Sequence, residues 1–346
     1  MQPESILVTG GAGYIGSHVA KELLERSDAK ITIIDNLSTG TRGRVEALEA
    51  IAGTPGRVEF IEADLADFRM IEGVFKAKRF DSLIHFAASI VVPESVEKPL
   101  KYYMNNTVNT TNLVHLANDY GVGRMIFSST AAVYGEPEEI PVKESTETAP
   151  INPYGMSKLM SESVIKDAAA ANEGFKYAIL RYFNVAGADM NGAESLVDIN
   201  PRIGQSFPDA THLIKIAAET ALGKRDRMYI FGEDFDTPDG TGVRDYIHVD
   251  DLSDAHLAAL EYLQNSPSDI FNVGYGHGYS VKEVIDVMKR VSGVDFEVEV
   301  GPRRAGDPAV LVSDNTKIRE KMGWKPRFDD LEKICKSALE WERKLS

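Results

Sequence analysis

The sequence predicts an α/β protein in which a doubly wound parallel sheet is followed by a smaller, mixed α/β part. In the first half, six short apolar runs alternate with helix-like stretches, a pattern typical of a parallel sheet covered by helices on both faces. The sequence pattern then changes: residues 188–209 are polar and suggest a loop, and the elements after them are shorter and mixed. The chain has 346 residues, enough for two packed parts.

The expected strands are rich in apolar residues and cover, in chain order, Ser5–Thr9, Lys30–Asp35, Val58–Glu62, Ser82–Phe86, Arg124–Ser128 and Tyr177–Tyr182. Between them, helices are expected to begin near Tyr14, Asp67, Leu100 and Tyr154. Later helices are expected near His212–Leu222, Asp250–Gln264, Val281–Val291 and Asp329–Lys344. We therefore expect one part over residues 1–184 and a second over 185–346, with the chain free to cross back between them. The second part should close over the carboxyl edge of the sheet, where α/β proteins bind ligands.

Composition excludes several classes of function. The formal net charge of −15 argues against nucleic-acid binding, which needs a basic surface. No apolar stretch approaches the roughly 18 residues of a membrane span, and the N-terminal segment has no pattern of a secretion signal. Cys335 is the only cysteine, so no intrachain disulfide can form, and a cytoplasmic location is expected. The seven histidines do not pair with other ligands at metal-binding spacings, so we expect no metal.

A glycine-rich turn follows the first expected strand. Its glycines, spaced G-x-x-G-x-x-G, permit a tight turn and let backbone N–H groups approach a pyrophosphate at the start of a helix. A carboxylate at the end of the second strand, 19 residues after the third glycine, can bind the adenosine ribose and would repel a 2′-phosphate. An ordinary glycine turn is the alternative, but the strand–turn–helix context indicates a Rossmann-type site for NAD rather than NADP. The residues expected to bind the cofactor here are Gly10, Gly13, Tyr14, Ile15, Gly16, Asp35 and Asn36.

Other strand ends should face the same crevice. Asp64 and Leu65 follow the third strand and suit the adenine side, and the segment Phe86-Ala87-Ala88 follows the fourth and suits the nicotinamide side. Each could serve packing alone. Five further residues are expected at the cofactor: Asn105, Ser128, Tyr154, Lys158 and Tyr182.

A tyrosine and a lysine lie four residues apart, at Tyr154 and Lys158. On a helix this spacing places both side chains on one face. A phenol with a pKa near 10 is too weak a base at neutral pH, but a neighbouring ammonium and a positive nicotinamide would lower that pKa. The phenol could then take a proton from a hydroxyl while a hydride leaves the same carbon. Thr130, near the end of the fifth strand, could orient the reacting oxygen. Such a pair is often only a helix face; the upstream glycine turn favours the catalytic interpretation.

The order of these motifs resembles the extended short-chain dehydrogenase/reductase family, and within it the UDP-glucose (UDP-galactose) 4-epimerase branch. The similarity runs over nearly the whole chain and is carried by GGAGYIGSH, DNLSTG, HFAASIVVPESVEKPLKYY, FSSTAAVYG, NPYGMSKLM, LRYFNVAGA, IFGEDFDTPDGTGVRDYIHVDDL, FNVG and GPRRAGD.

The resemblance implies a role for each matching residue. Tyr154 would be the catalytic base and acid, Lys158 its electrostatic partner and a ribose ligand, and Thr130 a hydrogen-bond partner of the sugar oxygen. The UDP moiety of the substrate would be held by Asn184, His212, Leu213, Tyr229, Arg244, Arg304 and Asp307, the two arginines clamping the diphosphate and Asp307 the uridine ribose. Leu311, four residues after Asp307, would gate the sugar pocket.

Three departures from the family pattern stand out. Ile90 replaces a lysine often found after the HFA segment, so one cofactor-phosphate contact should be missing. Thr130 replaces a serine and keeps the hydroxyl. His212 stands where some epimerases carry asparagine.

The implied reaction is 4-epimerisation of a UDP-hexose through a transient 4-keto sugar, with NAD bound throughout. A 4,6-dehydratase is disfavoured because Ala131 and Ala132 replace the acid pair expected after Thr130. Because leucine is smaller than tyrosine, Leu311 leads us to expect some activity on UDP-GlcNAc and UDP-GalNAc. UDP-glucuronate and UDP-pentose epimerisation stay open, as does, remotely, a non-catalytic NAD-binding regulator. Family members are commonly dimers, so a homodimer is expected through helices near Leu100–Tyr120 and Tyr154–Ala171.

Overall fold

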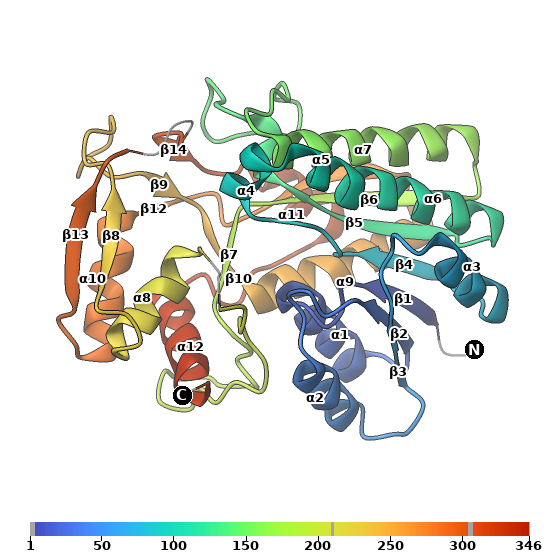
Figure 1. Ribbon diagram of the computed structural model, residues 1–346, viewed down its shortest axis with the longest axis horizontal. Helices are drawn as coiled ribbons and strands as arrows, with labels where there is room; N and C mark the ends of the chain where they lie inside the picture. The colour runs from blue at the N-terminus through green and yellow to red at the C-terminus, as the bar shows by residue number, and fades with distance from the viewer. Residues whose placement is uncertain (1–3, 209–210, 304–306, 346) are drawn as a thin grey trace.

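The computed structural model describes residues 4–208, 211–303 and 307–345 (Figure 1). Its centre is a seven-stranded sheet with the order β11-β6-β5-β4-β1-β2-β3, all neighbours parallel. The order reverses between β1 and β4, which creates a crevice at the carboxyl ends of these strands. The strands are β1 (Ser5–Thr9), β2 (Lys30–Asp35), β3 (Val58–Glu62), β4 (Ser82–His85), β5 (Arg124–Thr130), β6 (Lys176–Tyr182) and β11 (Asp269–Val273).

The predicted doubly wound α/β class is confirmed, and all six expected strands form. β5 runs two residues beyond the expectation and ends at Thr130, whereas β4 ends one residue earlier, at His85. The seventh strand, β11, was not predicted. Its sequence DIFNV is short and lies far along the chain, between two helical stretches.

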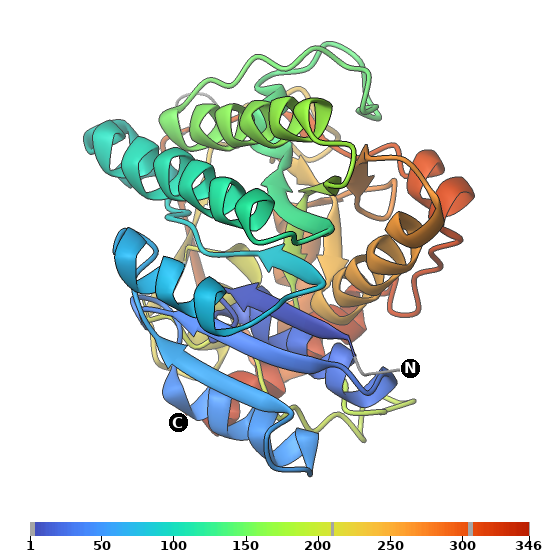
Figure 2. The same ribbon diagram turned by 90° about the vertical axis from the view of Figure 1, so that its right-hand side faces the viewer.

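Helices cover both faces of the sheet, as Figure 2 shows in the turned view. Ile6 and Val8 of β1 pack into one apolar cluster with the first group of helices, and Leu7 packs into the opposite cluster with the second. The first group is α1 (Tyr14–Arg26), α2 (Arg42–Ala52) and α9 (Val249–Asn265); the second is α3 (Phe68–Ala77), α6 (Asn109–Asp119) and α7 (Pro153–Ala171). The helix α2 was not predicted.

A broken helical run leads into α6. It consists of α4 (Val92–Glu97), α5 (Pro99–Tyr102) and a π-helical segment, Tyr103–Val108. Such π-helical turns are rare and occur often at functional sites. Asn105 lies within this one.

The second half of the chain forms small sheets and four further helices. β7 (Asn184–Ala186) pairs with β10 (Tyr246–His248), and β9 (Val243–Arg244) lies between β12 (Tyr279–Ser280) and β14 (Val310–Leu311). β8 (Arg227–Phe231) pairs with β13 (Glu297–Gly301). The helices are α8 (Leu213–Ala221), α10 (Val281–Ser292), α11 (Thr316–Met322) and α12 (Leu331–Lys344). Residues 187–208 contain neither helix nor strand, as expected.

Two elements of the second half pack with the first half of the chain. β11 extends the central sheet beside β6, and α9 packs on α1. We propose that the chain divides near residue 184 into two parts, with β11 and α9 as the segments that cross back. Within residues 4–208, 211–303 and 307–345, no helix is long and apolar enough to cross a membrane.

Candidate active site

The glycine-rich turn at the end of β1 has no room for side chains at two of its three glycines. Gly10 has φ +72°, and a Cβ there would lie 2.6 Å from the backbone nitrogen of Ala87. A Cβ at Gly16 would lie 2.3 Å from the carbonyl oxygen of Gly10. Gly13 is the N-cap of α1 and offers no side chain to bond the first N–H groups of the helix. These N–H groups can therefore bind an anion such as a dinucleotide phosphate, so the turn fits NAD.

Asp35 ends β2 beside this turn. Its carboxylate accepts hydrogen bonds from the backbone N–H of Ala12 at 3.0 Å and of Leu37 at 2.8 Å. Burial raises its pKa, and the backbone hydrogen bonds oppose that shift. Next to it, Asn36 donates to the Asp64 carboxylate at 2.8 Å, so these two predicted residues meet at the edge of the crevice.

Other predicted cofactor residues have structural contacts of their own. The Tyr14 hydroxyl donates to the Gly187 carbonyl at 2.6 Å and so ties α1 to the second half of the chain. Ile15 packs on the core at that end of α1, and Leu65 is buried in the opposite apolar cluster. Ala87 approaches Gly10 closely, and Phe86 lies with its ring 5.0 Å from the His256 ring.

The π-helical segment places two asparagines at the loop that follows β4. Asn105, which was predicted, donates to the Ser89 hydroxyl at 3.1 Å. Asn106 was missed, yet it is only 2% exposed and makes more contacts. It accepts from the Ser89 N–H at 2.8 Å, donates to the Ser89 carbonyl at 3.0 Å and donates to the Ser157 hydroxyl at 3.0 Å. Asn106 therefore joins this loop to α7, and only the repeated asparagine in YYMNN could have indicated it.

The predicted Tyr/Lys pair lies in the first turns of α7. Asn152 caps the helix by accepting from the Gly155 N–H at 2.9 Å, and Pro153 occupies the first helical position. Lys158 is 3% exposed and donates to the Ser128 carbonyl at 2.8 Å. Burial lowers the pKa of Lys158 to about 7, while Glu162 opposes the shift. The ammonium thus reaches across from α7 to the end of β5.

Tyr154 differs from the expectation in one respect. Burial raises its pKa, and a hydrogen bond with the Thr130 hydroxyl opposes that shift. The lowering of the Tyr154 pKa by Lys158 that the sequence led us to expect is not seen in the protein alone. The Lys158 ammonium bonds to the Ser128 carbonyl. The structure does bring Tyr154 and Thr130 together, as the motif order indicated.

Tyr182 closes the same end of the sheet. It is the last residue of β6 and pairs in register with Thr130 of β5. Its hydroxyl bonds to Nε2 of His256 at 2.5 Å. Because Nδ1 of His256 faces the Leu252 carbonyl at 2.8 Å, Nδ1 carries the proton and the Tyr182 hydroxyl is the donor to Nε2. Burial lowers the pKa of His256 to about 4, which keeps this imidazole neutral.

Three predicted substrate residues meet on the small sheet around β9. Arg244 forms an ion pair with Asp307, and it also donates to the Val243 carbonyl at 2.8 Å. Leu311 is the register partner of Arg244 on β14. Asn184, exposed at the start of β7, donates its backbone N–H to the Asp245 carbonyl at 2.9 Å, next to Arg244 along the chain.

Two aromatic rings are exposed on β8. Tyr229 is 46% exposed and Phe231 36%, with ring centroids 6.3 Å apart. Phe231 was missed, although strand alternation places it on the same face as Tyr229. His212 is the exposed N-cap residue of α8, and Leu213 is the first residue of that helix. Arg304 lies outside the described residues.

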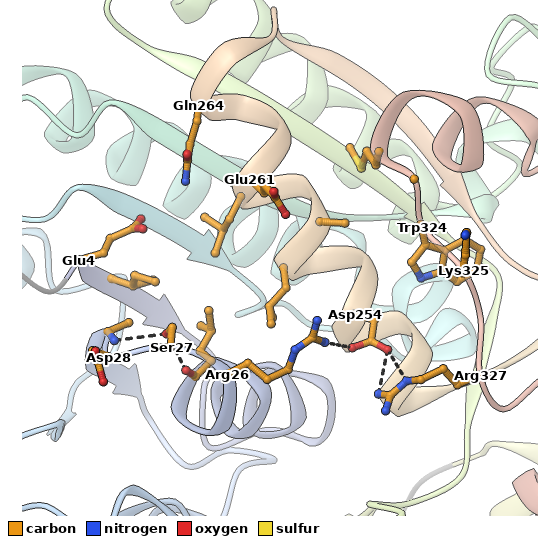
Figure 3. Close-up of a pocket in the computed structure, with 18 residues that line it drawn as sticks. Glu4, Arg26, Ser27, Asp28, Asp254, Glu261, Gln264, Trp324, Lys325 and Arg327 are labelled. Atoms are coloured by element: carbon orange, nitrogen blue, oxygen red, sulfur yellow. Dashed lines mark hydrogen bonds and ion pairs between the residues drawn. The ribbon is translucent and has the colours of Figure 1, made fainter. Parts of the chain in front are cut away.

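A cavity of about 770 Å³ lies away from all these residues (Figure 3). It is bounded by the ends of β1 and α1, by α9 and by the segment before Arg327. Asp254 lies at its rim, paired with Arg26 and Arg327. Because Glu4 precedes β1, this cavity is at the amino edge of the sheet, opposite the edge where α/β proteins bind ligands. Over the described ranges, no group of three or more His, Cys, Asp or Glu residues could hold a metal ion.

The fold and these residues define a dinucleotide-dependent enzyme of the extended Rossmann type. The chain matches the model of the NAD dependent epimerase/dehydratase family over residues 6–274 and belongs to that family. It is 49% identical to the UDP-glucose 4-epimerase of Azospirillum brasilense over 341 residues, 98% of this chain and 92% of that protein.

Solved structures agree over nearly the full chain. The UDP-Glc/GlcNAc 4-epimerase from Campylobacter jejuni is 57% identical, with a TM-score of 0.84 and 99% of each chain covered. The UDP-glucose 4-epimerase from Bifidobacterium longum, solved in complex with NAD+ and UDP, is 37% identical, with a TM-score of 0.91 and 98% of each chain covered.

Proposed function

We propose that this protein is an NAD-dependent UDP-sugar 4-epimerase that interconverts UDP-glucose and UDP-galactose. The observation that carries the proposal is the meeting of Tyr154, Thr130 and Lys158 at the carboxyl edge of the sheet, in a chain that belongs to the epimerase family. The glycine turn and Asp35 provide the NAD site at the same edge.

In the proposed reaction, Thr130 orients the sugar 4-hydroxyl and Tyr154 accepts its proton as the C4 hydrogen leaves as hydride. When bound, NAD supplies the hydride acceptor and later the donor, and its nicotinamide carries positive charge. The 4-keto sugar turns about its diphosphate, receives the hydride on its other face and regains the proton from Tyr154. Lys158, whose pKa burial lowers to about 7, supplies positive charge beside the site when it is protonated.

The substrate is proposed to be held mainly by its UDP moiety. Arg244 is suited to the diphosphate because a guanidinium fork matches phosphate oxygens, and its partner Asp307 is suited to ribose hydroxyls. The exposed rings of Tyr229 and Phe231 offer an apolar surface to the uracil. His212, Leu213 and Asn184 complete the proposed set, and Arg304 is proposed from the sequence alone. Firm binding of the nucleotide leaves the hexose free to turn.

A product assay without added NAD tests the proposal. Purified protein would be incubated with UDP-glucose, UDP-galactose, UDP-GlcNAc or UDP-GalNAc, and the sugars separated by chromatography. Interconversion of a C4 pair is expected. Should none interconvert even with NAD supplied, UDP-hexose epimerisation is wrong, and UDP-glucuronate and the UDP-pentoses are the next substrates.

We propose that Leu311 lets the site accept N-acetyl sugars. Replacing Leu311 by tyrosine should fill space beside Arg244 and lower activity on UDP-GlcNAc at least about tenfold while activity on UDP-glucose changes little. The ratio of kcat/KM for the two substrates measures this. Leu311→Met, which nearly conserves volume, is the control, and an unchanged ratio in Leu311→Tyr would refute the gating role. The 57% identity to a UDP-Glc/GlcNAc 4-epimerase supports the wider range.

A homodimer is proposed through the helical run from α4 to α6. Its exposed apolar residues recur every four positions, at Val96, Leu100, Met104 and Val108, and Leu100 is 75% exposed. This run packs beside α7, so the two form one outer face. We expect Leu100→Asp to shift the mass in solution toward the monomer, measured by light scattering after size exclusion. Val197→Asp, at a position 89% exposed in the loop after β7, should leave the mass unchanged.

A cytoplasmic location is also proposed. The sole cysteine, Cys335, is a free and fully buried thiol on α12, and its pKa is raised by that burial. A protein whose fold uses no disulfide fits a reducing compartment such as the cytoplasm.

A further inference from the structure

Arg44 is a buried cation whose hydrogen-bond partners are backbone carbonyl groups. It lies in the first turn of α2 and is 2% exposed. Nη1 donates to the Ala12 carbonyl at 3.0 Å, and Nε and Nη2 donate to the Gly204 carbonyl at 3.1 and 2.8 Å. Over the described residues, Arg44 forms no ion pair within 4.0 Å. Burial lowers its pKa to about 10, and Asp35 opposes the shift. Because a buried guanidinium loses its hydration, it is stable there only if its N–H groups form hydrogen bonds with the protein.

One partner, Ala12, lies inside the glycine-rich turn. The Ala12 N–H donates to Asp35 at 3.0 Å, and its carbonyl accepts from the Thr41 N–H at 3.1 Å as well as from Arg44. The segment between β2 and α2 approaches so closely that a Cβ at Gly40 would lie 3.0 Å from the Ala12 carbonyl carbon. Ala12, which directly precedes the second motif glycine, is therefore held through both its N–H and its carbonyl group.

The other partner, Gly204, lies in the loop from residue 187 to 208 and is pressed against the C-terminal helix. A Cβ at Gly204 would lie 2.4 Å from the Trp341 ring. The indole N–H of Trp341 donates to the Gln205 carbonyl at 3.2 Å, and Lys344 donates to the Pro201 carbonyl at 2.6 Å. Figure 1 shows this loop, yellow-green, between α12 and α1. One guanidinium therefore connects the turn, the loop and, through the loop, α12.

We propose that Arg44 is a positioning residue for the cofactor, which holds the glycine turn in its NAD-binding shape and couples NAD retention to the seating of α12. The inference rests on the proposed NAD site. A turn fixed before binding loses little conformational entropy when the phosphates arrive, so affinity is gained without any new contact to NAD. Charge-assisted hydrogen bonds in a buried place are strong enough for this role.

The test is NAD binding to the full-length protein, independent of turnover. Arg44→Met should release NAD at least about tenfold faster, which corresponds to about 1.4 kcal/mol of lost binding free energy. Release is measured as the amount of NAD that stays with the protein after gel filtration. The Kd for NAD is measured by titrating NAD into protein from which NAD has been removed. At saturating NAD, kcat should stay within about twofold of wild type. Trp341→Phe, which removes the bond to the loop but touches no residue of the turn, should also speed release, by a smaller factor.

Arg57→Met is the matched control. Arg57 also binds carbonyls, donating to Leu24 at 3.1 Å and Ser27 at 2.6 Å, but at the amino edge of the sheet. The Arg57→Met variant should retain NAD as the wild-type protein does. Retention of NAD by Arg44→Met, or equal loss in Arg57→Met, would overturn the proposal. If Arg44→Met does not fold, Arg44→Lys keeps the cation without the fork, and wild-type retention in that variant overturns it too. Wild-type protein that binds NAD yet converts no UDP-sugar would refute the proposed function and leave this result standing.

Discussion

Replacing Tyr154 by phenylalanine should lower turnover at least about a hundredfold, because proton transfer by a positioned side chain contributes about 10²–10⁴-fold. The change removes only the phenol oxygen, which forms a hydrogen bond with the Thr130 hydroxyl. Packing of the ring is kept, including its edge contact with Tyr102 at 6.5 Å between centroids. Neither the sugar hydroxyl nor the 4-keto oxygen would then have a proton acceptor or donor in place.

The measurement is kcat for UDP-galactose at saturating NAD, together with Kd for NAD and for UDP. Both Kd values should change little, because the contacts proposed for NAD phosphates and UDP lie on other elements. Tyr120→Phe is the control: its hydroxyl bonds to Glu72 at 3.4 Å, away from the carboxyl edge, and full activity is expected. Retention of more than about a tenth of wild-type turnover by Tyr154→Phe would show that another group moves the proton.

The parts of the fold that depend on local pattern could be predicted from the sequence. β1 and β2 match their expected bounds because apolar runs covered on both faces are continuous and end at turn residues. The glycine spacing could be interpreted because Gly10 and Gly16 have no space for a side chain. β11 could not be placed, because its position depends on pairing with β6, some ninety residues earlier.

The candidate site shows the same limit. Tyr154 and Lys158 were found because their spacing is local to one helix. Asn106 and Phe231 were missed because their contacts, with the loop at Ser89 and with the Tyr229 ring, form only in the folded chain. The direction of the Tyr154 pKa shift also could not be predicted, because it depends on burial of the phenol by the folded chain. Arg44 carries no motif, and its role follows only from the approach of residues 12 and 204.

Replacing Glu162 by alanine should lower the free energy of unfolding by about 3–5 kcal/mol, the cost of leaving a buried charge without its partner. Glu162 is fully buried one turn after Lys158, and it binds Arg181, itself 3% exposed, through bonds of 3.0 and 2.6 Å. The Ser129 hydroxyl donates to it at 2.5 Å, and the other end of Arg181 donates to the Tyr134 hydroxyl at 2.9 Å. The pair therefore joins α7 to β5 and β6 directly behind the proposed catalytic residues.

Urea unfolding of the NAD-free protein measures this loss. The exposed pair Arg42–Glu62 supplies the control: Glu62→Ala should cost no more than about 1 kcal/mol, because water and salt screen such a pair. The double variant Glu162→Leu/Arg181→Met should be more stable than Glu162→Ala, since no buried charge is then left alone. If Glu162→Ala costs as little as Glu62→Ala, the Arg181 guanidinium has found other partners or water. The junction of α7 with the sheet would then depend on apolar packing and on the hydrogen bond from Lys158 to the Ser128 carbonyl.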